Sequence, residues 1–148
     1  MTLRRVAVPA LAAWLVDSVY GFLVFGLALN GEFTKYPAVF RSFEAVNAMM
    51  PMLLASSLVG FIAIAYIFAK GYEGGRGIKE GFWFGVVLGS LMLFCVALPS
   101  YVIYNIGQRL ALLTCLATFV EWLIAGVVLG LVYKPAPVAA PSRRAVGV

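Results

Sequence analysis

Four long, continuously apolar segments constrain this chain more than any other feature of its sequence. They cover residues 6–29, 48–69, 81–103 and 110–133. Each is long enough for a helix to cross a hydrocarbon core of about 30 Å, and none alternates with the period of two that barrel strands show. The sequence therefore predicts an all-α polytopic membrane protein with four transmembrane helices in an antiparallel bundle.

The composition supports this class and argues against a water-soluble fold. Of the 148 residues, 64% are apolar and 11% are charged, whereas soluble domains have about half and a quarter. The basic residues flank the apolar segments and form no cluster with interleaved aromatic residues, which is what a nucleic-acid binder needs. We expect the lipid bilayer as the main partner and no nucleic acid.

We expect a membrane anchor at the N-terminal end of the chain and a flexible tail at its C-terminal end. Arg4 and Arg5 precede the first apolar segment, as in a signal peptide, but that segment is too long for a signal sequence and contains Asp17, so we expect it to stay as an anchor. Residues 1–134 then form one four-helix domain. Residues 135–148 are rich in Pro, Ala and Ser, which predicts a flexible cytoplasmic tail.

Lysine and arginine residues are divided unequally between the two sides of the predicted topology. Only three lie on one side, namely Lys35, Arg41 and Arg109. By the positive-inside rule, the richer side is cytoplasmic, which places both termini and the glycine-rich loop at residues 70–80 in the cytoplasm. The eight basic residues of that side are Arg4, Arg5, Lys70, Arg76, Lys79, Lys134, Arg143 and Arg144.

The loop over residues 30–47 is the longest connection, and it lies on the opposite side. Its aromatic residues give it an amphipathic character, so we expect it along the membrane interface. Arg41 and Glu44 are spaced for a pair on one helical face. The aromatic residues are Phe33, Tyr36, Phe40 and Phe43.

Two carboxyl groups lie deep inside predicted spans. Asp17 follows the start of its span by eleven positions, and Glu121 follows the start of its own span by the same number. An ionisable group at that depth is costly unless it is neutralised, hydrated or paired, and no Lys, Arg or His lies within a predicted span. Each carboxyl is therefore a candidate functional group.

The neighbours of these carboxyls favour contact between helices. Asp17 shares its helical face with small residues, and Glu121 shares its face with Thr118. One interpretation is a proton or cation site made of Asp17, Glu121, Thr118 and Ser56. Another is a pair of neutral acids that hydrogen-bond across the bundle, and a third is that the carboxyls face a water-filled cavity or a partner protein. Further hydrogen-bond partners would be Ser18, Ser57 and Tyr66.

Glycine repeats every four residues along the last two spans, at Gly81, Gly85 and Gly89 and at Gly126 and Gly130. Small residues at this interval let helices approach closely, either within the bundle or between chains of a homo-oligomer or larger complex. The loop at residues 70–80 also contains glycines and cations, but it lacks the GxxxxGK[ST] order. We expect a hairpin there, with contact to lipid phosphate as the alternative.

Several short motifs resemble those of a loosely defined group of small bacterial inner-membrane proteins with four helices. The motifs are Lys70-Gly71-Tyr72-Glu73-Gly74, Glu80-Gly81 followed by Phe84-Gly85 and Gly89, and Glu121 through Gly126 and Gly130 to Val132-Tyr133-Lys134. The resemblance implies the bacterial inner membrane and a four-helix topology, and it carries no activity. Small multidrug exporters share only the architecture and a carboxylate in the first helix.

The sequence predicts no enzyme, no cofactor and no metal site. It has no His, and neither cysteine, Cys95 or Cys115, stands in a CxxC pair. We expect a non-catalytic integral membrane protein that serves as an accessory or assembly subunit or associates with itself. The alternative is a small proton- or cation-coupled transporter that uses Asp17 and Glu121.

Overall fold

The computed structural model describes residues 3–135, and within this part of the chain every regular element is a helix. Four helical stretches are long and apolar enough to cross a membrane: Arg4–Ala28, Met50–Gly71, Gly77–Ile103 and Gln108–Val132. The expected all-helical class with four membrane-compatible helices is confirmed. Apart from Pro135, the tail expected at residues 135–148 lies outside the described residues, as do Arg143 and Arg144.

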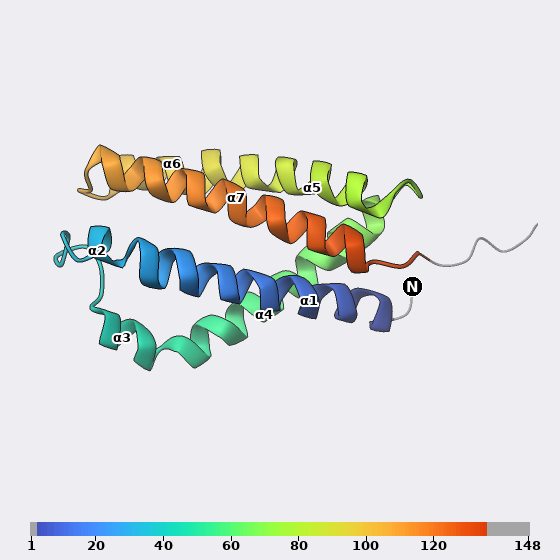
Figure 1. Cartoon of the computed structure of the whole chain (residues 1–148), viewed down its shortest axis with the longest axis horizontal. Coiled ribbons are helices and arrows are strands. Elements are labelled where there is room, and N and C mark those ends of the chain that lie inside the picture. Colours follow the sequence, from blue (N-terminus) through green and yellow to red (C-terminus); the bar gives the residue numbers. More distant parts are fainter. Residues whose placement is uncertain (1–2, 136–148) are drawn as a thin grey trace, which may run out of the picture.

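Two of the four stretches are built from more than one element, and Figure 1 labels their α-helices. The first joins an α-helix to a π-helical segment, and the third places a π-helical segment between two α-helices. In chain order the elements are α1 (Leu3–Gly21), η1 (Phe22–Ala28), α2 (Asn30–Phe33), α3 (Phe43–Ala48), α4 (Met50–Gly71), α5 (Gly77–Met92), η2 (Leu93–Ala97), α6 (Leu98–Ile103) and α7 (Gln108–Val132).

Two prolines fit these boundaries. Pro51 lies in the first turn of α4, where its missing N–H would have had no partner in any case. Pro99 lies at the start of α6, directly after the wider turn of η2. A wider turn gives the proline ring room against the preceding carbonyl groups, so the third span continues through a residue that would otherwise kink it.

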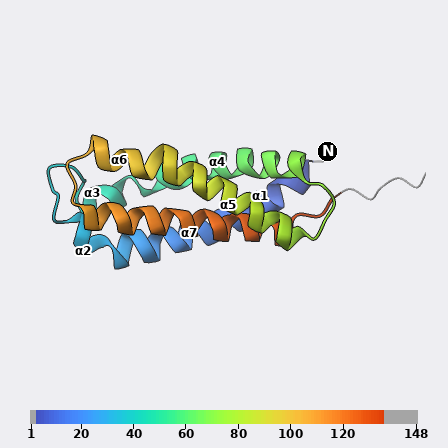
Figure 2. The same cartoon turned by 90° about the horizontal axis from the view of Figure 1, so that it is seen from above.

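The helices lie side by side in the order α5, α7, α1, α4, and α7 packs against both α5 and α1. Figures 1 and 2 show the N-terminal end, the end of α7 and the α4–α5 turn at one end of the molecule. The other end holds α2, α3 and the turn between α6 and α7. The core where α1, α4 and α7 meet is formed by Val6, Ala10, Ala13, Phe61, Ala65, Phe68, Ala125 and Leu129.

The closest helix pair is α5 with α7, and it is lined by glycine on both sides. A methyl group added at Gly81 would lie 2.8 Å from the Cα of Gly130, and one at Gly85 would lie 2.9 Å from the carbonyl oxygen of Leu123. Gly126 faces the backbone of Gly81 and Gly85 in return. The two backbones are therefore in direct contact, which side chains at these positions would prevent.

An aromatic cluster joins α4, α5 and α7 at the end that holds the α4–α5 turn. The ring of Phe68 lies 5.2 Å from that of Phe84, 5.6 Å from that of Tyr133 and 5.9 Å from that of Tyr72, centre to centre. The three pairs have edge-to-face geometries, which aromatic rings prefer. The cluster therefore ties α4 to the α5–α7 pair at this end.

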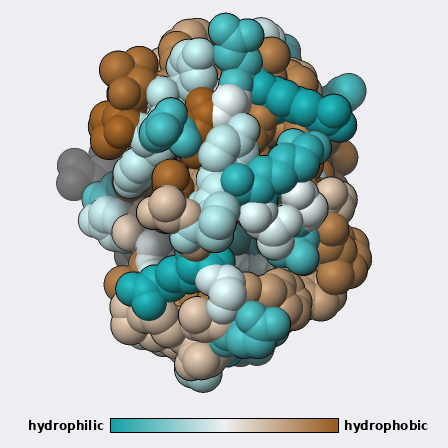
Figure 3. All heavy atoms as spheres, turned by 90° about the vertical axis from the view of Figure 1, so that its left-hand side faces the viewer, coloured by the Kyte–Doolittle hydropathy of each residue, from teal (hydrophilic) through white to brown (hydrophobic). Residues whose placement is uncertain are grey.

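At the opposite end, the loop at residues 30–47 contacts the start of α7. The Glu32 carboxylate accepts from Lys35 at 2.8 Å and lies 3.3 Å from the guanidinium of Arg109, and these cations hold the pKa of Glu32 below its usual value. The hydroxyl of Tyr36 accepts from the backbone N–H of Gly107 at 2.9 Å. Figure 3 views this end and shows hydrophilic residues across it.

The pair expected between Arg41 and Glu44 is not formed, since the ion pairs at this end are those of Glu32. Arg41 lies before α3, so the two side chains do not share a helical face. Ser42 starts α3 instead, and its hydroxyl accepts from the backbone N–H of Ala45 at 3.3 Å.

Candidate polar site between helices α1, α4 and α7

A cavity of about 210 Å³ lies where α1, α4 and α7 face one another, and both predicted carboxyls line it. Asp17 comes from α1 and Glu121 from α7. The wall on α4 is contributed by Ser57, Gly60, Phe61 and Ile64, and Trp122 of α7 completes the lining. The ring of Trp122 stacks on that of Phe61 with 5.8 Å between the ring centres.

Hydrogen bonds fix α1 against α4 beside Asp17. The indole N–H of Trp14 donates to the hydroxyl of Ser57 at 2.9 Å and to the carbonyl of Leu54 at 3.2 Å. Trp14 lies three residues before Asp17, so both side chains lie on the face of α1 that meets α4. Gly60 has no atom of another part of the chain within 4 Å of its missing side chain, which leaves space beside the carboxyl.

A second hydrogen bond fixes α1 against α7 beside Glu121. The hydroxyl of Tyr20 donates to the carbonyl of Ala117 at 2.9 Å, one helical turn before Glu121. Carboxylate oxygen Oε1 of Glu121 lies 3.8 Å from the position that a side-chain carbon would take at Gly21. Because Gly21 follows Asp17 by four residues on the same face, Glu121 approaches α1 within one turn of Asp17.

Neither carboxyl has a protein partner among residues 3–135. The hydrogen bonds next to them are those of Trp14, Ser57 and Tyr20, and the ion pairs of the described chain belong to Glu32. Both carboxyls are half-buried. Two carboxylates that share a small cavity between membrane spans repel each other, and a proton or a bound cation would remove that repulsion.

Of the other candidate residues, Ser57 lines the cavity, and Ser56, Thr118 and Tyr66 lie outside it. Ser56 is exposed and its hydroxyl donates to the carbonyl of Leu53 at 2.9 Å, whereas Ser57 lines the site. The two differ because one residue rotates a helical position by about 100°. Thr118 is half-buried on α7 and does not line the cavity, and Tyr66 is exposed.

Sequence reasoning missed the hydrogen-bonding roles of Trp14 and Tyr20. A signal for both was available, because they are polar aromatic residues placed three positions before and after Asp17 in an otherwise apolar helix. Their N–H and O–H groups need partners when buried, so they indicate contacts with neighbouring helices. The partner atoms depend on how the helices are rotated, which a single sequence does not give.

The chemistry of the site follows from its oxygen atoms. Carboxylates and a serine hydroxyl are hard ligands, suited to protons and to cations such as Na⁺, and they are poorly suited to soft transition metals. Within residues 3–135 no group of three His, Cys, Asp or Glu side chains is placed to hold a metal ion. The cavity thus brings together carboxyl and hydroxyl oxygens from three helices, which are ligand types that protons and small hard cations prefer.

No family model, curated protein or solved structure matches this chain.

Proposed function

We propose that this chain is a non-catalytic membrane protein that takes up a proton or small cation at Asp17 and Glu121 and couples it to transport. The observation that supports the proposal is the cavity itself. Two carboxyls from different spans line it, and neither bonds another described residue. Neutral acids that only hold helices together would be expected to hydrogen-bond across the helix contact.

Helix α4 is the element most suited to change access to this site. It packs against α1, while its contacts with α5 and α7 are made by side chains such as Phe61 and Phe68. Figure 1 shows α4 crossing α1 so that its N-terminal end lies away from α6 and α7. A tilt of α4 about the aromatic cluster would open or close the cavity, as rocking of helices does in transporters.

The role that the sequence analysis expected first, an accessory or assembly subunit, rested on glycine faces that a partner helix would cover. In the structure, the glycines of α5 and α7 face each other within one chain. They therefore offer no free surface for a second protein, and this observation favours the carboxyl site as the basis of function.

The test is to remove each charge while keeping the shape of the side chain. In proteoliposomes, the parent should carry an inward flux of H⁺ or Na⁺ along an imposed gradient, and Asp17→Asn and Glu121→Gln should each lower this flux at least tenfold. Infrared spectra should show carboxyl bands that titrate in the parent and disappear in the variants. The matched control is Glu44→Gln, which removes an exposed carboxyl of α3 and should change neither result.

A parent that shows no flux and no titrating carboxyl band within its spans would overturn the proposal. If Asp17→Asn and Glu121→Gln also fold and assemble as the parent does, an accessory role becomes the better explanation. Circular dichroism and elution volume in mild detergent decide whether each variant is folded.

A further inference from the structure

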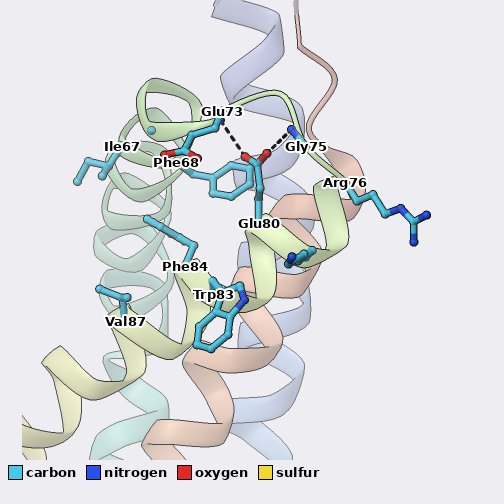
Figure 4. Close-up of a pocket in the computed structure, with 11 residues that line it drawn as sticks. Ile67, Phe68, Glu73, Gly75, Arg76, Glu80, Trp83, Phe84 and Val87 are labelled. Carbon is cyan, nitrogen blue, oxygen red and sulfur yellow. Dashed lines mark hydrogen bonds between the residues drawn. The ribbon is translucent and has the colours of Figure 1, made fainter.

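A second and larger cavity, of about 620 Å³, lies between α4 and α5 at the end that holds their connecting turn (Figure 4). We call it the groove. Its wall is apolar and follows both helices: Ile67 and Phe68 on α4, and Trp83, Phe84 and Val87 on α5. The exposed fractions of Ile67, Trp83 and Val87 are 59%, 58% and 68%. Because both helices are membrane-compatible spans, this wall faces the place where acyl chains lie.

Charged groups of both signs stand at the turn end of the same cavity. Arg76, Lys79 and Glu73 contribute to its lining, and none of them forms an ion pair with another residue of 3–135. Glu80 differs, because its carboxylate accepts from the backbone N–H of Glu73 at 3.0 Å and from that of Gly75. Figure 4 shows these two bonds, with Arg76 extending outward from the start of α5.

We propose that this groove binds one glycerophospholipid whose headgroup carries a primary ammonium group. An acyl chain would lie along the apolar wall of α4 and α5. The phosphate would be held by Lys79 together with Arg76, whose exposed side chain would turn from its outward rotamer toward the groove, and the ammonium by Glu73. The turn between Gly71 and Gly77 joins two spans, so its charges lie at the depth of lipid headgroups.

The balance of charge favours this headgroup over two others. An anionic lipid without an amine would place its phosphate beside Glu73 and leave that carboxylate unpaired. A choline headgroup has a positive charge but no N–H group to donate to a carboxylate. The cavity volume is within the range of sites for small molecules, so it accepts a headgroup, the glycerol and the upper part of a chain.

Trp83 lines the groove and can report on the lipid directly. In a Trp14→Phe, Trp122→Phe background it is the only tryptophan of the chain. Lipids with brominated acyl chains quench tryptophan on contact, so we compare phosphatidylethanolamine, phosphatidylglycerol and phosphatidylcholine at equal mole fractions. We expect phosphatidylethanolamine to bind about two- to fivefold more tightly than phosphatidylcholine, since exposed ion pairs contribute modestly.

Substitutions of the charged residues test which of them sets the preference for one lipid headgroup over another. Glu73→Gln should remove the advantage of phosphatidylethanolamine over phosphatidylcholine, and Arg76→Gln with Lys79→Gln should weaken both phosphatidylethanolamine and phosphatidylglycerol. The matched control is Lys70→Gln, which removes a cation from the same end of the molecule that lies over the ring of Tyr66 and outside the groove. It should leave the ranking unchanged.

The proposal is overturned if the parent shows no preference for phosphatidylethanolamine, if phosphatidylglycerol ranks first, or if Lys70→Gln acts like the groove variants. Competition by millimolar glycerol phosphate would also overturn it, because a free phosphate compound would then suffice. Native mass spectrometry of the unmodified chain with the same lipids gives the ranking independently of the tryptophan substitutions. The inference does not depend on the carboxyl site, so either one can fail alone.

Discussion

Gly85 shows how a single missing side chain sets the distance between two helices. An added methyl group there would lie 2.9 Å from the carbonyl oxygens of both Trp122 and Leu123, which are backbone atoms and cannot rotate away. We predict that Gly85→Ala lowers the free energy of unfolding by about 1–3 kcal/mol, the usual cost of overpacking. Thermal unfolding in mild detergent measures the change.

Gly60 is the matched control for this substitution, because it also lies within a span but has no other part of the chain within 4 Å of its missing side chain. Gly60→Ala should leave stability unchanged or raise it by up to about 1 kcal/mol, as alanine is the better helix former. Equal losses for the two variants would show that α5 and α7 do not touch at Gly85.

At the residue scale, the sequence identified the charged members of the site but not its complete lining. Asp17 and Glu121 stand out because a carboxyl within an apolar span is costly. Ser57 and Ser56 cannot be distinguished in this way, because both are small polar residues and only the rotation of α4 brings Ser57 to the cavity. Gly60 matters through the space it leaves, which depends on its neighbours in the fold.

At the scale of elements, two contacts join the loop at residues 30–47 to the segment at the start of α7: the ion pair of Glu32 with Arg109 and the hydrogen bond that Tyr36 accepts from the partly buried N–H of Gly107. Tyr36→Phe leaves that N–H without its partner, so we predict a loss of about 1 kcal/mol in the free energy of unfolding. Faster hydrogen exchange at Gly107 should accompany it.

Tyr104→Phe provides the control, since Tyr104 is half-exposed and its hydroxyl bonds no described residue. It should change neither stability nor exchange at Gly107. If Tyr36→Phe is as stable as the parent and Gly107 exchanges at the parental rate, the loop at residues 30–47 is not held to the bundle by this bond.

Elements were predicted best where composition alone defines them. The span expected at residues 110–133 is the helix Gln108–Val132, because a long apolar run has no other stable form in a bilayer. The π-helical segments η1 and η2 were not predicted, since a change from α-helical to π-helical hydrogen bonding within an apolar span leaves no periodic signal in the sequence. The spatial order α5, α7, α1, α4 depends on which faces match, which hydropathy does not show.

The whole molecule combines a tightly packed pair of helices with a more loosely attached one. Glycine contacts join α5 and α7 backbone to backbone, while α4 is attached through side chains and through α1. The polar cavity is lined by residues of α1, α4 and α7, and none of its lining residues belongs to α5. Elements that move in function come from the less stable parts of a protein, so the proposed tilt of α4 would leave the α5–α7 pair intact.

The orientation of the molecule in the membrane is the last prediction, and it follows from charge. Of the basic residues in the described chain, Arg4, Arg5, Lys70, Arg76, Lys79 and Lys134 belong to one end, and only Lys35, Arg41 and Arg109 to the other. Translocation disfavours basic residues, so we expect the first end in the cytoplasm. In a Cys95→Ala, Cys115→Ala background, a cysteine at Thr34 should react with a membrane-impermeant maleimide added outside spheroplasts. One at Ser142 should react only in inverted vesicles, and one at Val59, which lies within α4, should react in neither preparation. The reverse pattern at Thr34 and Ser142 would invert the molecule and place the proposed lipid groove in the opposite leaflet.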